Sequence, residues 1–185
     1  MFIQTEPTPN PSTLKFLPGR EVAGSRVAEY RSASEAEASP LAAALFSVDG
    51  VSQVFLGNDF VSVTKGGGEW QHLKPSILGV IMEHFISGAP VFAGAEAESE
   101  AEDEFFDATD SDTVDQIKEL IETRVRPAVA GDGGDIRFRG FKDGTVYLAM
   151  KGACSGCPSS TATLKHGIQN LLKHFVPEVQ AVEQI

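Results

Sequence analysis

The sequence predicts two small α+β domains joined by an acidic flexible linker, and three observations lead to this fold class. First, 185 residues are enough for one medium domain or two small ones, and the apolar share of 42% suffices for packed cores that would be thin if divided between two. Second, each half of the chain combines short strand-like segments with segments of helical apolar spacing. Third, residues 96–112 contain nine acidic residues and no basic residue. We therefore predict domains at 1–92 and 113–185, joined by a linker at 93–112.

The linker is rich in alanine, glutamate and serine, so it cannot bury enough apolar surface to fold, and its charges repel one another. We interpret it as a solvated tether. A docking site for a basic partner, anchored by Phe105 and Phe106, is the alternative interpretation. The chain shows no basic patch with interleaved aromatic residues and no apolar run of membrane-spanning length. We therefore expect no nucleic-acid partner and no membrane partner.

Three short segments of the N-terminal half have the composition of β-strands. Residues 13–17 follow a proline-rich stretch and end at Pro18-Gly19. Residues 51–56 and 60–64 flank a Gly-Asn-Asp turn, so we predict that they pair as a hairpin.

Helical spacing also occurs in this half of the chain. A short helix is predicted around 41–47, and a longer one begins at Pro75, which suits a first helical turn. The apolar stripe of the longer helix consists of Ile77, Leu78, Ile81, Met82 and Phe85. His72 and His84 have no ligand types beside them, so we expect surface or packing roles rather than metal binding.

The C-terminal half predicts the order α-β-β-α-β. Its first helix has Ser111 or Asp112 as the N-cap and Pro127 near its end. The apolar stripe of this helix consists of Val114, Ile117, Leu120, Ile121 and Val125. A turn at 131–135 then leads into a strand at 136–139.

The remaining elements follow from turn chemistry and spacing. Asp143-Gly144 tolerates the positive φ angles of a type I′ turn, which predicts a hairpin with a return strand at 146–150. A second helix begins at Pro158, and a short strand is predicted at 179–182. The apolar side of that helix consists of Leu164, Ile168, Leu171, Leu172 and Phe175.

The chain has only two cysteines, Cys154 and Cys157, in the sequence GACSGCP between the return strand and the second helix. Their spacing lets both sulfurs bind one metal or close one small disulfide. We expect an exposed, glycine-flanked loop whose thiol pKa values are lowered by the helix N-terminus at Pro158. So few cysteines also indicate a reducing compartment.

Two thiolates are only half of a ligand set, because structural zinc and iron–sulfur clusters usually take four protein ligands. A second copy of the chain would supply the other pair. The residues alone leave three classes open: an iron–sulfur cluster carrier, a zinc-bridged interaction module and a dithiol oxidoreductase. The oxidoreductase is disfavoured because the pair follows a late hairpin and no tryptophan stands directly before Cys154.

Five polar residues near the cysteine loop are weaker candidates. Lys151, His166 and Lys173 could tune the thiolate charge, but ordinary solvated roles are expected for them. Asp132 and Asp135 invite a carboxylate-ligand interpretation. Their position in a glycine-rich turn makes capping of backbone groups the expected role.

The sequence from Arg126 to Glu183 resembles the C-terminal domain of the NifU-like (Nfu) iron–sulfur cluster proteins. The motifs GDGGDI, GACSGCPSS and VPEV occur there together and in order. The opening TEPTPNPSTLKFLPG similarly resembles the Nfu N-terminal domain. The similarity thus extends over most of the chain outside the acidic linker.

The resemblance implies a cluster scaffold or carrier that is not an enzyme. It implies one [4Fe-4S] cluster per homodimer, held by Cys154 and Cys157 of each chain, with a [2Fe-2S] cluster as the alternative. The implied partners are an upstream cluster donor and apo iron–sulfur client proteins. We expect a bacterial cytoplasmic location because the first residues show no targeting pattern, or the mitochondrial matrix for a mature eukaryotic form.

Overall fold

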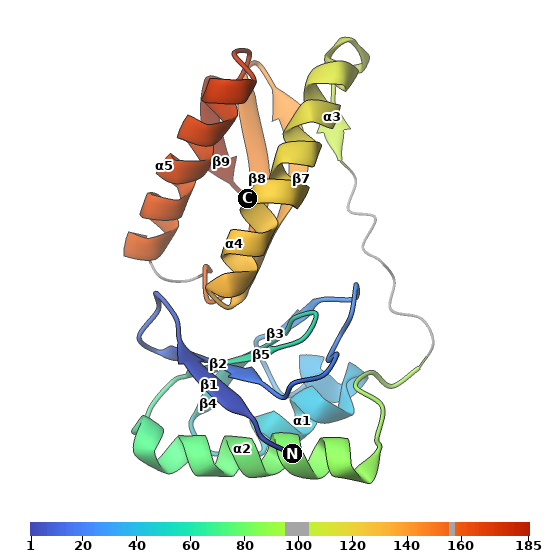
Figure 1. Cartoon of the computed structure of the whole chain (residues 1–185), viewed down its shortest axis with the longest axis vertical. Helices are drawn as coiled ribbons and strands as arrows, with labels where there is room; N and C mark the ends of the chain where they lie inside the picture. Colours follow the sequence, from blue (N-terminus) through green and yellow to red (C-terminus); the bar gives the residue numbers. More distant parts are fainter. Residues whose placement is uncertain (95–103, 156–157) are drawn as a thin grey trace. The chain divides into compact units, whose positions relative to one another are not determined.

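The computed structural model describes residues 1–94, 104–155 and 158–185. The chain divides into two compact units, Met1–Glu98 and Ser99–Ile185, and each has its own sheet and helices (Figure 1). The predicted fold class of two small α+β domains is confirmed. None of the helices in the described ranges is both long and apolar enough to cross a membrane.

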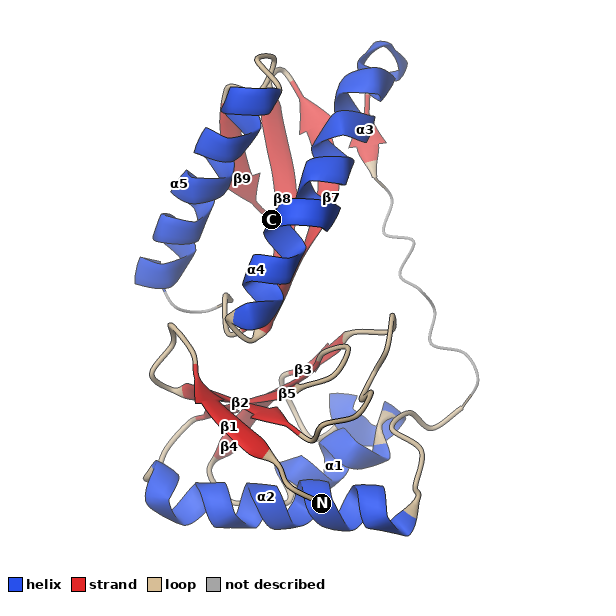
Figure 2. Ribbon diagram, in the orientation of Figure 1, coloured by secondary structure: helices blue, strands red, loops and turns tan. Residues whose placement is uncertain are grey.

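The N-terminal unit is built on a five-stranded antiparallel sheet in the order β1-β2-β5-β4-β3. Helices α1 and α2 lie on the same side of this sheet (Figure 2). Phe16 and Val54 of the sheet, Leu41 of α1 and Ile77 of α2 have no exposed surface, so the core lies between these layers. The elements are β1 (Gln4–Pro7), β2 (Thr13–Leu17), β3 (Ala28–Tyr30), the 3₁₀ helix η1 (Glu35–Ala38), α1 (Pro40–Phe46), β4 (Val51–Leu56), β5 (Val61–Lys65) and α2 (Trp70–Ser87).

The strand predictions at 13–17 and 51–56 are confirmed at both bounds, and the one at 60–64 is confirmed as Val61–Lys65. Strands β1 and β3 were not predicted. β1 lies at the edge of the sheet and ends in Pro7. A proline is tolerated at this edge position because its missing N–H is not needed for hydrogen bonds between strands. β3 has only three residues, too few to show a period.

The predicted short helix is confirmed as α1, but α2 begins at Trp70 instead of Pro75. Pro75 lies inside α2 at an exposed position, away from the core. The buried stripe of α2 consists of Leu73, Ile77, Ile81 and His84, so it starts one turn earlier than predicted. His84 therefore has a packing position, and burial lowers its pKa, whereas His72 is exposed.

The C-terminal unit has a four-stranded mixed sheet in the order β6-β7-β8-β9. The central pair β7–β8 is antiparallel, and the two outer strands run parallel to their neighbours. The helices cover one face of the sheet (Figure 1). The elements are β6 (Phe105–Phe106), the 3₁₀ helix η2 (Ala108–Asp110), α3 (Ser111–Leu120), the π-helical turn η3 (Ile121–Val125), α4 (Arg126–Gly131), β7 (Gly134–Lys142), β8 (Thr145–Gly152), α5 (Pro158–Phe175) and β9 (Ala181–Gln184).

Segments α3, η3 and α4 follow one another without a gap and replace the single predicted helix. The π turn resets the hydrogen-bond pattern, so Pro127 falls in the first turn of α4, where its missing N–H is tolerated. Asp110 occupies the N-cap position of α3, so the prediction of Ser111 or Asp112 is wrong. The predicted stripe residues Val114, Ile117, Ile121 and Val125 are buried.

The β7–β8 hairpin turns at Asp143 and Gly144, with φ angles of 52° and 78°, as the type I′ prediction requires. Helix α5 begins at Pro158 as predicted. Its last residue, Phe175, is 44% exposed and lies outside the core, contrary to the prediction. The final strand β9 begins two residues later than predicted, at Ala181.

Strand β6 was not predicted. Phe105 and Phe106, placed in the linker at 93–112 by their acidic surroundings, pair in parallel with Gly140 and Phe141 of β7. The residues that follow form η2 and the start of α3. The interpretation of the whole segment as an unfolded tether is therefore wrong for residues 104–112.

Ser39 tests the packing of the N-terminal unit. Its buried hydroxyl accepts a hydrogen bond from the Ala42 N–H at 3.2 Å, as an N-cap of α1, and donates one to the Val91 carbonyl. We predict that Ser39→Ala lowers the free energy of unfolding by about 1–2 kcal/mol, because both backbone groups lose a buried partner. Urea unfolding followed through the fluorescence of Trp70, the only tryptophan, measures this.

The matched control is Ser47→Ala at the other end of α1. Ser47 is exposed, although its hydroxyl also bonds a backbone carbonyl, that of Ala44. We expect a change below about 0.5 kcal/mol, as for an ordinary surface substitution. Equal losses for both variants would contradict the capping role of Ser39.

Candidate functional site

Cys154 lies just past the end of β8, in the turn that leads toward α5. The last residue of β8, Gly152, is paired with Gly134, the first residue of β7. The Cys154 side chain is buried, with 5% of its surface exposed, and it belongs to the apolar core of the C-terminal unit. Cys157, the other predicted ligand, lies outside the described residues. The predicted exposed loop is therefore wrong for Cys154.

Hydrogen bonds hold this turn against its surroundings. The Ala153 N–H donates to the Gly133 carbonyl at 3.2 Å, which ties the turn to the connection between α4 and β7. Ser155 donates to the Gly152 carbonyl through its N–H at 3.1 Å and its Oγ at 2.9 Å. The Thr161 hydroxyl of α5 donates to the Cys154 carbonyl at 2.9 Å. The Cys154 backbone is thus fixed between β8 and the first turns of α5.

Gly134 makes room for the sulfur. A Cβ atom at this position would lie 2.7 Å from the Lys151 carbonyl oxygen and 2.9 Å from the Cys154 Sγ. Both distances are shorter than real Cβ contacts, so only glycine fits here without a shift of the backbone. This role was not predicted, because the GDGGD motif indicated only a turn. The signal that could have predicted it is the pair Gly133-Gly134 at the start of a strand, since glycine in a strand often marks a close approach of other atoms.

Burial and charge raise the pKa of Cys154 to about 11. Burial of the thiol is the larger cause, and the carboxylates of Asp132 and Asp135 add to it. The prediction that the helix N-terminus lowers the pKa is therefore wrong for Cys154 in the metal-free chain. Its thiol is neutral at pH 7, so a metal that binds the sulfur must displace the proton.

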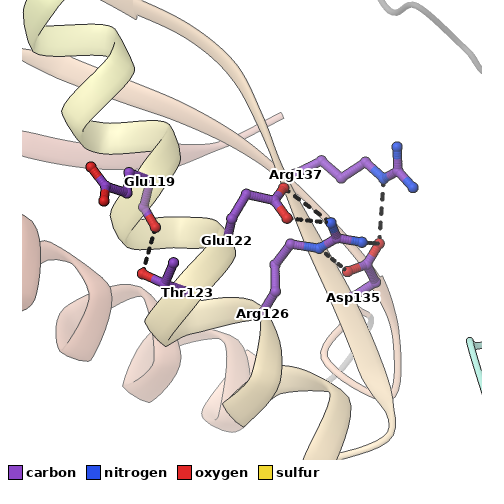
Figure 3. Close-up of polar contacts among 6 residues, drawn as sticks. All are labelled: Glu119, Glu122, Thr123, Arg126, Asp135 and Arg137. Carbon is purple, nitrogen blue, oxygen red and sulfur yellow. Dashed lines mark hydrogen bonds and ion pairs between the residues drawn. The ribbon is translucent and has the colours of Figure 1, made fainter. Parts of the chain in front are cut away.

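Asp135 is the centre of an ion-pair network next to this site (Figure 3). Its buried carboxylate accepts hydrogen bonds from the Arg126 Nε at 2.9 Å and Nη2 at 3.3 Å, and it pairs with the Arg137 Nε at 3.4 Å. The Arg126 Nη1 also binds the Glu122 carboxylate at 2.7 Å and 3.0 Å. The predicted capping role of Asp135 is wrong, because its carboxylate joins the helical segment to β7.

The same view shows how the π turn is accommodated. The Thr123 hydroxyl donates to the Glu119 carbonyl at 2.6 Å (Figure 3). The Thr123 side chain thus bonds a carbonyl one turn earlier in the chain, within the segment where the backbone hydrogen bonds change from the α-helical to the π-helical pattern. Arg126 begins α4 directly after the π turn, so the turn determines where Arg126 meets Asp135.

The remaining sequence candidates have ordinary positions. His166 and Lys173 are exposed on α5, and Lys151 is half-buried at the end of β8. Within residues 1–94, 104–155 and 158–185, no three His, Cys, Asp or Glu side chains are grouped closely enough to hold a metal ion.

Both units match protein-family models. Residues 3–88 match the model for the scaffold protein Nfu/NifU N terminal, and residues 117–183 match the NifU-like domain. NifU-like protein 5, mitochondrial, of Arabidopsis thaliana is 52% identical over 187 aligned residues, which cover 100% of this chain and 68% of that protein. The chain belongs to the Nfu family of NifU-like proteins. The family prediction from GDGGDI, GACSGCPSS and VPEV is confirmed.

A further relative and a solved structure are also similar to this Nfu chain. The NFU1 iron-sulfur cluster scaffold homolog, mitochondrial, of Drosophila virilis is 51% identical, and the alignment covers 100% of this chain and 62% of that protein. A solution structure of a NifU-like protein from Saccharomyces cerevisiae has a TM-score of 0.45 and 28% identity, covering 50% of this chain and 85% of the other. The Nfu chain thus spans about two thirds of the two mitochondrial relatives. The family is one of scaffolds rather than enzymes, as predicted.

Gly134→Ala tests the close approach of the sulfur to β7. We predict a loss of about 1–3 kcal/mol in the free energy of unfolding, because the new methyl group must displace a backbone carbonyl or the sulfur. In a Cys157→Ser background, reaction of Cys154 with a thiol reagent should also become faster. The control is Gly167→Ala on α5, where nothing lies within 4 Å and a gain of up to about 1 kcal/mol is expected. Unchanged stability and thiol reactivity in Gly134→Ala would contradict the packing role.

Asp135→Asn tests the ion-pair network. We predict that this substitution lowers the free energy of unfolding by about 1–3 kcal/mol, because Arg126 keeps its charge but loses the buried carboxylate of Asp135. Glu122→Gln is the control, since Glu122 is 57% exposed and such pairs contribute at most about 1 kcal/mol. Hydrogen exchange of the β7 amides measures the loss of stability in each variant. An equal loss in both variants would contradict the role of Asp135 in joining the helical segment to β7.

Proposed function

We propose that this Nfu protein binds one [4Fe-4S] cluster between two chains and transfers it to apo-proteins, with Cys154 and Cys157 of each chain as the ligands. The observation that carries the proposal is the incomplete ligand set. Cys154 has no grouped metal ligands among the described residues, and Cys157 is the only other cysteine. Because the cluster takes four thiolates, two chains are needed.

Association of the chains follows from linkage. A cluster that binds two chains together, and neither chain alone, shifts the equilibrium toward the dimer. Cluster assembly also displaces the thiol proton of Cys154, whose pKa is raised to about 11. The positive charge of iron then compensates the nearby Asp132 and Asp135, which disfavour a bare thiolate. Without the cluster, the chain is thus a monomer and the Cys154 thiol is protonated.

Transfer proceeds by exchange of ligands. A cluster donor supplies the cluster, and thiolates of an apo iron–sulfur client replace the scaffold cysteines one after another. The unit around 113–185 carries the cluster, and the unit around 1–92, which has no cysteine, serves partner recognition. The location proposed is the bacterial cytoplasm, or the mitochondrial matrix for a eukaryotic chain, and the relatives named above are mitochondrial.

The structure counts against the dithiol oxidoreductase alternative. A redox dithiol needs an accessible thiolate near neutral pH. Cys154 is 5% exposed and burial raises its pKa, so neither condition holds for this cysteine in the metal-free chain. A [2Fe-2S] cluster or a shared zinc ion uses the same four sulfurs, so metal content must distinguish these alternatives.

Anaerobic reconstitution with ferrous and ferric iron and sulfide tests the proposal. We predict a brown dimer with about four irons and four sulfides per pair of chains. About two irons per pair would indicate the [2Fe-2S] alternative, and a colourless zinc dimer would contradict the proposal. Cys154→Ser and Cys157→Ser should each abolish cluster binding. Cys154→Ser is also expected to lose about 1–2 kcal/mol of stability, since its thiol is buried in the core.

A mixed-chain experiment tests sharing of the ligands. The intact chain is mixed with an affinity-tagged chain that carries both Cys→Ser substitutions, and the mixture is reconstituted. The tagged chain should recover no iron, because a mixed pair offers only two thiolates. Recovery of a full cluster with the tagged chain would overturn the ligand assignment. The Gly167→Ala chain, tagged in the same way, should recover iron and serves as the control.

A further inference from the structure

Strand β6 attaches a short acidic and aromatic segment to the edge of the C-terminal sheet. The Phe105 ring lies against Gly140 of β7 and against the Tyr147 ring of β8, with ring centroids 5.1 Å apart. Glu104 forms an ion pair with Lys118 of α3. Phe105 and Phe106 are paired in parallel with Gly140 and Phe141. Three consecutive residues thus contact α3, β7 and β8.

The surface that contacts Glu104 and Phe105 is formed by Gly140, Tyr147 and Lys118, and we call it the groove. A Cβ atom at Gly140 would lie 2.5 Å from two carbons of the Phe105 ring, so the missing side chain provides the space that the ring fills. The β7–β8 register shifts between Phe138 and Gly140, and such bulges redirect a strand edge. The Tyr147 ring contacts the Phe105 ring, and the Lys118 ammonium group pairs with the Glu104 carboxylate. The groove therefore fits an acidic residue followed by an aromatic residue.

The segment that fills this groove is held loosely. Only two residues pair with β7, and both phenylalanines remain about 40% exposed, at 41% and 39%. The Glu104–Lys118 pair is exposed at 36% on each side, and such surface pairs contribute little. The segment remains in place because residues 107–110 connect it directly to α3, with Asp107 accepting hydrogen bonds from the Thr109 N–H and hydroxyl. Covalent attachment gives it a high effective concentration.

We propose that the β7 edge is a binding site for an extended segment of a partner protein, with an acidic residue followed by two aromatic residues. The chain's own Glu104–Phe106 segment occupies this site at rest and excludes weak competitors. The partner segment adds to the sheet in parallel with β7 and places its first aromatic ring over Gly140. This is strand addition to an exposed edge, with the groove giving side-chain specificity.

The site is separate from the cysteines. Gly134 and Cys154 lie at one end of the β7–β8 pair, and Gly140 and Phe141 lie toward the hairpin at the other end. Six residues of strand separate Gly134 from Gly140, which corresponds to about 20 Å. A partner bound here would leave the cluster ligands uncovered. The proposal does not depend on cluster binding and is tested on the metal-free chain.

The test uses the full chain with Phe105→Ala and Phe106→Ala, which empties the groove. The probe is a synthetic peptide with the sequence of residues 104–110, EFFDATD, titrated against ¹⁵N-labelled protein. We expect the amides of Gly140, Phe141 and Tyr147 to shift, with an affinity at least about tenfold higher than for the intact chain, because the attached segment no longer competes. A peptide with both phenylalanines replaced by alanine should cause no shift.

A third variant separates recognition from nonspecific binding. Adding Gly140→Val to the emptied chain fills the space for the ring and should abolish peptide binding. Equal binding by the emptied and filled variants, or equal binding by the intact and emptied chains, would overturn the proposal. If the double variant loses its dispersed amide spectrum, Phe105→Ala alone is titrated with the same expectations. A metal-free dimer of the intact chain that Phe105→Ala abolishes would make a second copy the occupant and would overturn the assignment to a partner protein.

Discussion

The cysteine site depends on the close approach of two strand ends that carry glycine. Gly134 begins β7 opposite Gly152 at the end of β8, and the missing side chain of Gly134 leaves space for the Lys151 carbonyl and the Cys154 sulfur. The same packing that positions the sulfur also buries it and raises its pKa. The packing that positions the Cys154 sulfur is therefore also the larger cause of its raised pKa. In the metal-free chain, the Cys154 side chain is thus buried and its thiol is protonated at pH 7.

Strand β7 connects this site to the rest of the C-terminal unit. Asp135, one residue after Gly134, binds Arg126 and so fixes the start of the strand to the helical segment. The other end of β7 carries Gly140, against which the Phe105 ring packs. One strand thus supports a buried cysteine at one end and an aromatic contact at the other. The aromatic contact at Gly140 does not involve either cysteine.

Much of the fold could be predicted from spacing and turn chemistry. The Asp143-Gly144 turn and the start of α5 at Pro158 follow from local rules that tertiary packing did not override. Strand β6 could not be predicted, because Phe105 and its neighbour lie in acidic surroundings and pair with a distant strand. The cysteine site likewise has one feature that depends on local sequence and one that depends on the fold. The cysteine spacing predicted that the two sulfurs bind one metal or close one small disulfide, whereas the raised pKa of Cys154 depends on burial and on aspartates that folding brings near it.

The central claim is that one cluster takes two thiolates from each of two chains. Native mass spectrometry of the reconstituted protein tests it most directly, because the mass gives chain number and cluster content together. We predict a species of two chains with one [4Fe-4S] cluster and a single cluster-free chain after chelation. A single chain that holds a complete cluster would contradict the claim.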